Sequence, residues 1–251
     1  MLFDLDDTLF DHRVCARTAL TTLHEAYDAL RGRRFEEVER LHAAFLEELH
    51  GRVTSGELPL EQARRERFRR LFTAVGVTLS EDDVARAAET YRGGYMKIRR
   101  AIAGAAALLA AVKERGQVGI VSNNLLEEQQ GKLRQCGLDR FVDELVVSEE
   151  TRVSKPDPRI FQIALDRLGR RANEVVMVGD SWAADVIGAR AAGIRAIWFN
   201  PEHLPSPEPD AGVAELESLE PIDCALATIF AGHHEAPSVT ESDAEGKREK
   251  G

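Results

Sequence analysis

Apolar residues recur at intervals of three and four along residues 13–96, a spacing that places them on one face of a helix. Four such stripes follow one another. Ser80 stands before the last stripe and is followed by acidic residues through Asp83, which is the usual composition of a helix start. Glycines separate the stripes, at Gly32, Gly51, Gly56 and Gly76. This segment is therefore predicted to be an all-helical bundle.

After residue 100, short apolar runs alternate with helical stretches. The apolar runs, predicted to be buried strands, are 118–121, 145–147, 175–178 and 194–199. The helical stretches are 105–114, 126–136, 159–168 and 183–192. Such alternation predicts a parallel sheet with right-handed crossovers. Residues 213–219 and 225–230 are expected to add an edge strand and a last helix.

The sequence starts with a three-residue apolar segment that runs directly into Asp4. It is expected to be a buried strand, either a short one or one that starts upstream, since central strands usually have about 5–6 residues. The predicted fold class is α/β: a doubly wound, parallel, Rossmann-like sheet formed by 1–12 and 97–230, with the all-helical segment 13–96 inserted. Residues 231–251 are polar and charged and are expected to be disordered.

The composition narrows the possible functions. The chain has 251 residues, 43% of them hydrophobic and 30% charged, as in ordinary globular proteins. Its net charge of -10 argues against nucleic-acid polymers or anionic lipid surfaces as partners. No apolar run reaches the ~18 residues of a membrane span, and the acidic start does not resemble a secretory signal. The three cysteines are far apart, which favours a reducing, cytoplasmic location. The oligomeric state is left open.

Small polar or charged residues follow four of the predicted strands, where ligands bind in open α/β sheets. They are Asp4 and Asp6, Ser122, Asn123 and Asn124, Lys155, and Asp180 with Asp185. Each group alone is ordinary turn chemistry. Together they predict one crevice in which the carboxylates of Asp4, Asp6 and Asp180, one hydroxyl and one ammonium converge.

Three neighbouring carboxylates repel one another, so Asp4, Asp6 and Asp180 together require a cation. Oxygen-only ligands suit Mg²⁺. A magnesium ion beside the Ser122 hydroxyl and the Lys155 ammonium points to a bound phosphate, because both groups and the metal interact well with its oxygens. A small phosphorylated metabolite is therefore the expected partner.

In these motifs, in their order and spacing, the chain resembles the haloacid dehalogenase-like superfamily of phosphohydrolases over roughly residues 1–230. The Asp-x-Asp-x-Thr motif is 4–8, the second and third motifs are Ser122 and Lys155, and the Gly-Asp-x-x-x-x-Asp motif is 179–185. The helical insert resembles the C1-type cap of subfamily I. Residues 147–156 resemble those of pyrimidine 5′-nucleotidases and related phosphatases.

The resemblance implies a role for each residue. Asp4 would be the nucleophile that forms an aspartyl-phosphate, and Asp6 the general acid and then base. Lys155 would neutralise developing charge. Thr8 would brace the first turn, while Ser122 and the Asn123 backbone would hold the phosphoryl group. Mg²⁺ would bind the Asp4 carboxylate, the Asp6 carbonyl and Asp180. Asp185 would contact these ligands rather than the metal itself.

The predicted function is that of a Mg²⁺-dependent phosphomonoesterase acting on nucleoside 5′-monophosphates or another small phosphometabolite. The alternatives are a phosphoglycolate or sugar-phosphate phosphatase and a phosphomutase. A 2-haloacid dehalogenase is disfavoured by Asp6, and a non-catalytic binding protein by the complete motif set. Residues 52–57 are expected to hydrogen-bond the leaving group. Tyr91 and Tyr95 are expected to pack in the cap core, and Gly93-Gly94 to form either a hinge or a plain loop.

Overall fold

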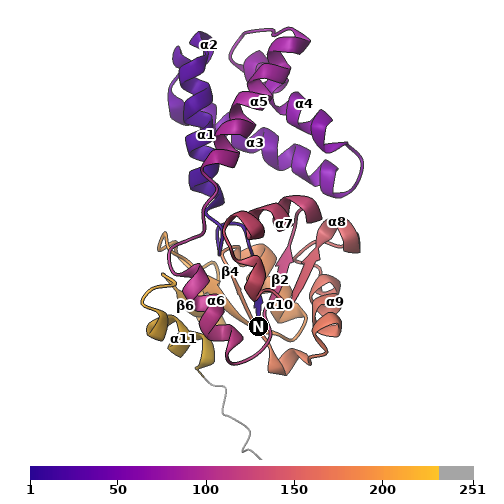
Figure 1. Ribbon diagram of the computed structural model, residues 1–251, viewed down its shortest axis with the longest axis vertical. Coiled ribbons are helices and arrows are strands. Elements are labelled where there is room, and N and C mark those ends of the chain that lie inside the picture. The colour runs from indigo at the N-terminus through magenta and orange to yellow at the C-terminus, as the bar shows by residue number, and fades with distance from the viewer. Residues whose placement is uncertain (232–251) are drawn as a thin grey trace, which may run out of the picture.

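The computed structural model describes residues 1–231, so the segment expected to be disordered lies, apart from Ala231, outside the described residues. Six parallel strands form one sheet in the order β3-β2-β1-β4-β5-β6 (Figure 1). The strands are β1 (Leu2–Phe3), β2 (Gly119–Ser122), β3 (Glu144–Val147), β4 (Val176–Gly179), β5 (Arg195–Phe199) and β6 (Ala214–Leu216). The predicted α/β class and parallel sheet are confirmed. The expected edge strand at 213–219 is shorter than predicted.

β1 has two residues, yet it lies at the centre of the sheet and pairs with β2 on one side and β4 on the other. Its side chains alternate between the two faces. Leu2 packs with Ile160 and Phe161, whereas Phe3 packs with Leu108 and Leu109 on the opposite side. Both β1 side chains are fully buried. The short strand is therefore hydrogen-bonded to a neighbour on each side and packed by side chains on each face, as a central strand of a doubly wound sheet requires.

Helices cover both faces of the sheet. They are α6 (Ala105–Lys113), α7 (Leu126–Gln135), α8 (Ser148–Thr151), α9 (Pro158–Leu168), α10 (Ile187–Ala191) and α11 (Ile222–Phe230). The helix expected over 183–192 begins instead with a π-helical turn, Trp182–Val186. The Val186 N–H reaches back five residues to the Ser181 carbonyl. This wider turn sets the direction of Asp185.

The inserted segment consists of α1 (His12–Ala26), α2 (Asp28–Arg31), α3 (Phe35–Thr54), α4 (Leu60–Ala74) and α5 (Glu81–Lys97). In Figure 1 these helices lie together at one end of the molecule, apart from the helices that flank the sheet, and they enclose their own apolar core. The predicted start at Ser80 is confirmed, because its hydroxyl accepts a hydrogen bond from the Asp83 N–H. No helix among residues 1–231 is long and apolar enough to cross a membrane.

The Gly93-Gly94 pair lies inside α5, so the expectation of a plain loop was wrong. Gly94 faces α1, where an added Cβ would stand 3.3 Å from the Ala19 Cα. The absence of a side chain thus lets α1 and α5 approach closely along their length. A hinge role for the pair stays a prediction.

Candidate active site

The first turn of the site follows β1. The Asp4 N–H donates to the Val178 carbonyl at 2.9 Å, which continues the sheet pairing by one residue. Asp7 has a positive φ of 59°, a conformation that aspartate tolerates better than most residues. Thr8 is fully buried and its hydroxyl accepts from the Asp180 N–H at 3.0 Å. The turn after β1 is therefore tied directly to the turn after β4.

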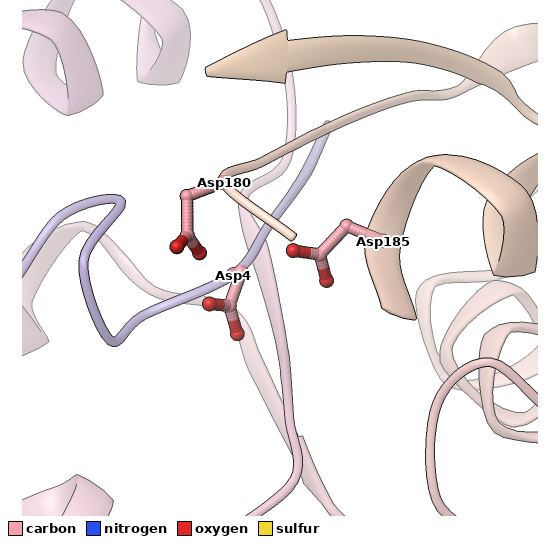
Figure 2. A group of neighbouring side chains, drawn as sticks. All are labelled: Asp4, Asp180 and Asp185. Carbon is pink, nitrogen blue, oxygen red and sulfur yellow. The ribbon is translucent and has the colours of Figure 1, made fainter. Parts of the chain in front are cut away.

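Three carboxylates from two of these turns converge, as Figure 2 shows. Oxygen atoms of Asp4, Asp180 and Asp185 all lie within 4.8 Å of one another. The Lys155 ammonium joins them and donates to Asp4 Oδ1 and Asp185 Oδ1, each at 2.6 Å. All four residues come from positions that the sequence singled out. The expected triad differs in one member, because the carboxylate of Asp185 rather than that of Asp6 completes the cluster.

The side chain of Asn123 holds the lysine in place. Its amide donates to the Lys155 carbonyl at 2.8 Å and accepts from the Lys155 N–H at 2.7 Å. This pair of hydrogen bonds links the loop after β2 to the loop after β3. The sequence pointed only to the backbone of Asn123, so this positioning role of its side chain was missed.

Burial dominates the electrostatics of the cluster. It raises the pKa of Asp4 well above its usual value, against the opposing effect of Lys155. Burial, with Asp185 and Asp7 nearby, raises the pKa of Asp180 to about 7. For Lys155, burial opposes the charge, but Asp185 and Asp4 raise the pKa above its ordinary value. The Lys155 ammonium and the Arg13 guanidinium, which lies 3.3 Å from Asp180, thus face three carboxylates. This oxygen-rich, underneutralised donor set fits a hard divalent cation such as Mg²⁺.

Gly179 leaves room for Asp185. A Cβ at this position would collide with the Asp185 carboxylate, which also accepts from the Ser181 N–H at 3.0 Å. The glycine of the Gly-Asp motif is therefore required by a close approach rather than by its own backbone angle.

We expect Gly179→Ala to destabilise the protein by about 1–3 kcal/mol, the usual cost of overpacking a core. Thermal unfolding measures this as a drop in Tm. Gly116→Ala is the matched control, because no atom lies within 4 Å of a Cβ there. Equal Tm values for the two variants would contradict the assigned close approach.

The side chain of Asp6 turns away from the cluster. It accepts hydrogen bonds from Lys132 Nζ at 2.5 Å, Gln129 Nε2 at 2.9 Å and Asn124 Nδ2 at 3.1 Å. Burial opposes its charge, yet Lys132 and the nearby His12 hold the pKa of Asp6 well below its usual value. Asp6 is therefore held as a carboxylate. Its expected link to the cluster through the backbone carbonyl stays a prediction.

Gln129 also connects Asp6 to Ser122, whose hydroxyl accepts from the same Nε2 atom at 2.5 Å. Gln129 and Lys132 are buried and lie three residues apart on α7. That spacing was the available signal, since it places both side chains on one face of the helix toward the turn after β1. The sequence predicted a helix over 126–136 but gave no role to either residue.

A cavity of about 370 Å³ lies between the inserted helices and the loops of the sheet. Asp6, Asn123 and Lys132 belong to its core side. On the insert side, α3, α4 and α5 contribute Leu46, His50, Leu60, Arg64, Arg67, Tyr91 and Tyr95 among others. A contact of 2.8 Å between His50 Nε2 and the Asn123 carbonyl joins the two sides.

The expectation for residues 52–57 was wrong, because none of them lines this cavity. Gly56 instead faces the Arg152 guanidinium. The packing expectation for the tyrosines is confirmed, since Tyr91 belongs to the insert core and Tyr95 packs against it. Both tyrosines also form part of the cavity wall.

Comparisons with known proteins agree with this geometry. A family model described as haloacid dehalogenase-like hydrolase matches residues 1–193. The pyrimidine 5′-nucleotidase YjjG of Escherichia coli is 35% identical over 140 residues, which are 54% of this chain and 62% of that protein, so the match spans less than two thirds of it. A ribulose-1,5-bisphosphate 5-phosphatase of Halopiger xanaduensis is 31% identical over a region that covers 80% of this chain and 84% of that protein.

Among solved structures, the Bacillus subtilis HAD-hydrolase YfnB bound to magnesium superposes with a TM-score of 0.71 at 26% identity. The superposition covers 90% of this chain and 96% of YfnB.

Proposed function

The chain belongs to the haloacid dehalogenase-like hydrolase family, and on that premise we propose that it is a Mg²⁺-dependent phosphomonoesterase that acts on nucleoside 5′-monophosphates through an aspartyl-phosphate. The observation that carries the proposal is the group of buried Asp4, Asp185 and Lys155 with half-buried Asp180, beside the cavity under the inserted helices. The relative YjjG, a pyrimidine 5′-nucleotidase, supports the substrate class.

Asp4 is the nucleophile of the proposed reaction. Its carboxylate oxygen bonds to phosphorus while the bond from phosphorus to the leaving oxygen breaks. Lys155, at 2.6 Å from Asp4, opposes the negative charge that gathers on the phosphoryl oxygens. Ser122 and the Asn123 backbone orient the phosphoryl group. In the second step water bonds to phosphorus, and the Asp4–phosphorus bond breaks to release phosphate.

Asp6 transfers the protons. It gives one to the leaving oxygen in the first step and takes one from water in the second. The contact with Lys132 holds Asp6 deprotonated, which is the form required for the second step. Over the full cycle, the proton that Asp6 takes from water in the second step replaces the proton that it gives to the leaving oxygen in the first.

Asp4 and Asp180, with the Asp6 carbonyl, would hold Mg²⁺, and Asp185 would support them through Lys155 and the Ser181 N–H. When bound, Mg²⁺ supplies positive charge to the phosphoryl oxygens and to the carboxylate cluster.

We expect Mg²⁺ to raise the Tm of the protein, because it neutralises carboxylates that repel one another in a buried site. Asp180→Asn should raise the Tm in EDTA by removing one of these charges, and should blunt the shift caused by Mg²⁺. Asp210→Asn, at an exposed position, is the control. A full Mg²⁺ shift in Asp180→Asn would contradict the assigned metal site.

The function itself is tested by hydrolysis of para-nitrophenyl phosphate with Mg²⁺ and with EDTA, followed by a substrate panel. We expect kcat/KM for UMP and dTMP to exceed that for phosphoglycolate and for ribose 5-phosphate. The relative from Halopiger xanaduensis makes sugar phosphates the second candidate class. A tenfold lead of phosphoglycolate or of the sugar phosphate, about 1.4 kcal/mol of transition-state binding, would contradict the nucleotidase proposal.

A further inference from the structure

Arg67 of α4 lines the cavity without a partner among residues 1–231. Its guanidinium takes part in no ion pair or hydrogen bond there, and its Nε atom is buried with no acceptor in reach. The guanidinium carbon lies 4.8 Å from the ring centroids of both Phe68 and Tyr91. These aromatic faces stabilise the charge but accept none of its N–H groups in a conventional hydrogen bond.

The other cations around the cavity are engaged. Glu128 pairs with Arg64 at 2.6 Å and with Arg92 at 3.2 Å. Lys132 pairs with Asp6. His42 lies near Arg67 but offers it no negative charge. Burial and the Arg67 charge lower the pKa of His42 well below its usual value, so its ring stays neutral. Arg67 is thus the cavity cation, within the described part of the chain, whose donors are free for a ligand.

Arg67 is half-buried, and its buried Nε atom without an acceptor is costly, so the site favours an acceptor that arrives with the substrate. The residues of the cavity wall indicate which kind of ligand group would supply that acceptor. Tyr91, Leu46 and Leu60 offer apolar and aromatic surface suited to a flat ring. Glu47 also lines the wall, whereas the Glu128 carboxylate is already paired with three arginines. An apolar, aromatic wall beside a guanidinium with free donors fits a planar ring with carbonyl oxygens on its edge.

We propose that Arg67 is a specificity-determining residue that donates hydrogen bonds to the carbonyl oxygens of the pyrimidine base. This inference rests on the proposed nucleotidase function and adds the group that distinguishes the base. Uracil and thymine present two such oxygens, cytosine one and adenine none. Ribose 5-phosphate has no base and therefore cannot use Arg67.

The test compares wild type, Arg67→Met and Arg67→Lys with UMP, CMP, AMP and ribose 5-phosphate at one Mg²⁺ concentration. Arg65→Met is the matched control, since Arg65 is exposed on the same helix and does not line the cavity. Arg67→Met should lower kcat/KM for UMP about tenfold or more, as expected for loss of hydrogen bonds from a charged donor. For AMP and ribose 5-phosphate the change should stay within about twofold, with CMP between.

Arg67→Lys should recover part of the loss for UMP, because it restores a charged donor without the planar fork. The inhibition constant of uridine should weaken in parallel in Arg67→Met. The Tm of that variant should stay close to that of wild type, because the substitution removes a buried Nε donor without an acceptor and keeps an apolar chain against the two aromatic rings. These three results would support a direct contact with the base.

Two results would overturn the inference while the proposed function stands. One is a wild type that prefers UMP together with an unchanged UMP preference in Arg67→Met. The other is an equal loss for all four substrates with a lowered Tm, which would make Arg67 structural. A wild type that does not prefer UMP to ribose 5-phosphate would overturn both the nucleotidase function and the role of Arg67.

Discussion

Asp4→Asn should lower kcat by about 10⁴-fold or more, because removal of the nucleophile leaves only binding and charge stabilisation to assist the reaction. The amide has nearly the shape of the carboxylate but does not attack phosphorus. Lys155 keeps its contact with Asp185 in this variant, so the site should remain folded. Loss of one of the three clustered carboxylates should also leave the Tm equal or higher.

The measurement is kcat for UMP and para-nitrophenyl phosphate with Mg²⁺, with circular dichroism to verify the fold. Binding of UMP to Asp4→Asn, measured by calorimetry, should persist. Activity above a few per cent of wild type would remove Asp4 from the role of nucleophile.

Asp6→Asn should lower kcat by about 10²–10⁴-fold, the usual contribution of general acid–base catalysis. Because Asp6 acts in both steps, the steady-state rate and the formation of the aspartyl-phosphate should both be slower in this variant. This variant also leaves the Lys132 ammonium buried beside an amide, and removing one partner of a buried pair destabilises a protein.

The double variant Asp6→Asn with Lys132→Met separates chemistry from stability. It removes both charges, so its Tm should recover toward that of wild type while kcat stays low. Lys132→Met alone is the third corner of the cycle. Recovery of kcat together with the Tm would show that Asp6 acts on the fold rather than on the reaction.

Much of the fold was predictable because local patterns carry it. The three- and four-residue spacing over 13–96 predicted four helices, and the structure shows five, because extended backbone at Tyr27 divides the first of them into α1 and α2. The short apolar runs predicted β2, β3, β4 and β5 to within a residue or two. The carboxyl ends of parallel strands share one edge of a sheet, so Asp4, Lys155, Asp180 and Asp185 could be placed together before any coordinates.

Contacts between segments far apart in sequence could not be predicted from these local patterns. The Asp6 carboxylate pairs with Lys132, 126 positions away, and only the packing of α7 against the first turn decides this. The direction of Asp185 depends on the π-helical turn over Trp182–Val186 and on the space at Gly179. Hydrophobic periodicity contains no information about either.

The sequence by itself determined which residues stand at the ends of the strands, and with them the chemistry of the site, because a strand places its last residue at the sheet edge whatever its neighbours are. Only the tertiary structure decided which side chains around the cavity are satisfied. Glu128 can neutralise Arg64 and Arg92 but forms no ion pair with Arg67, whose guanidinium carbon lies 4.8 Å from the Phe68 and Tyr91 rings. Whether a charge is paired depends on distances between separately folded segments, and those distances are set by packing.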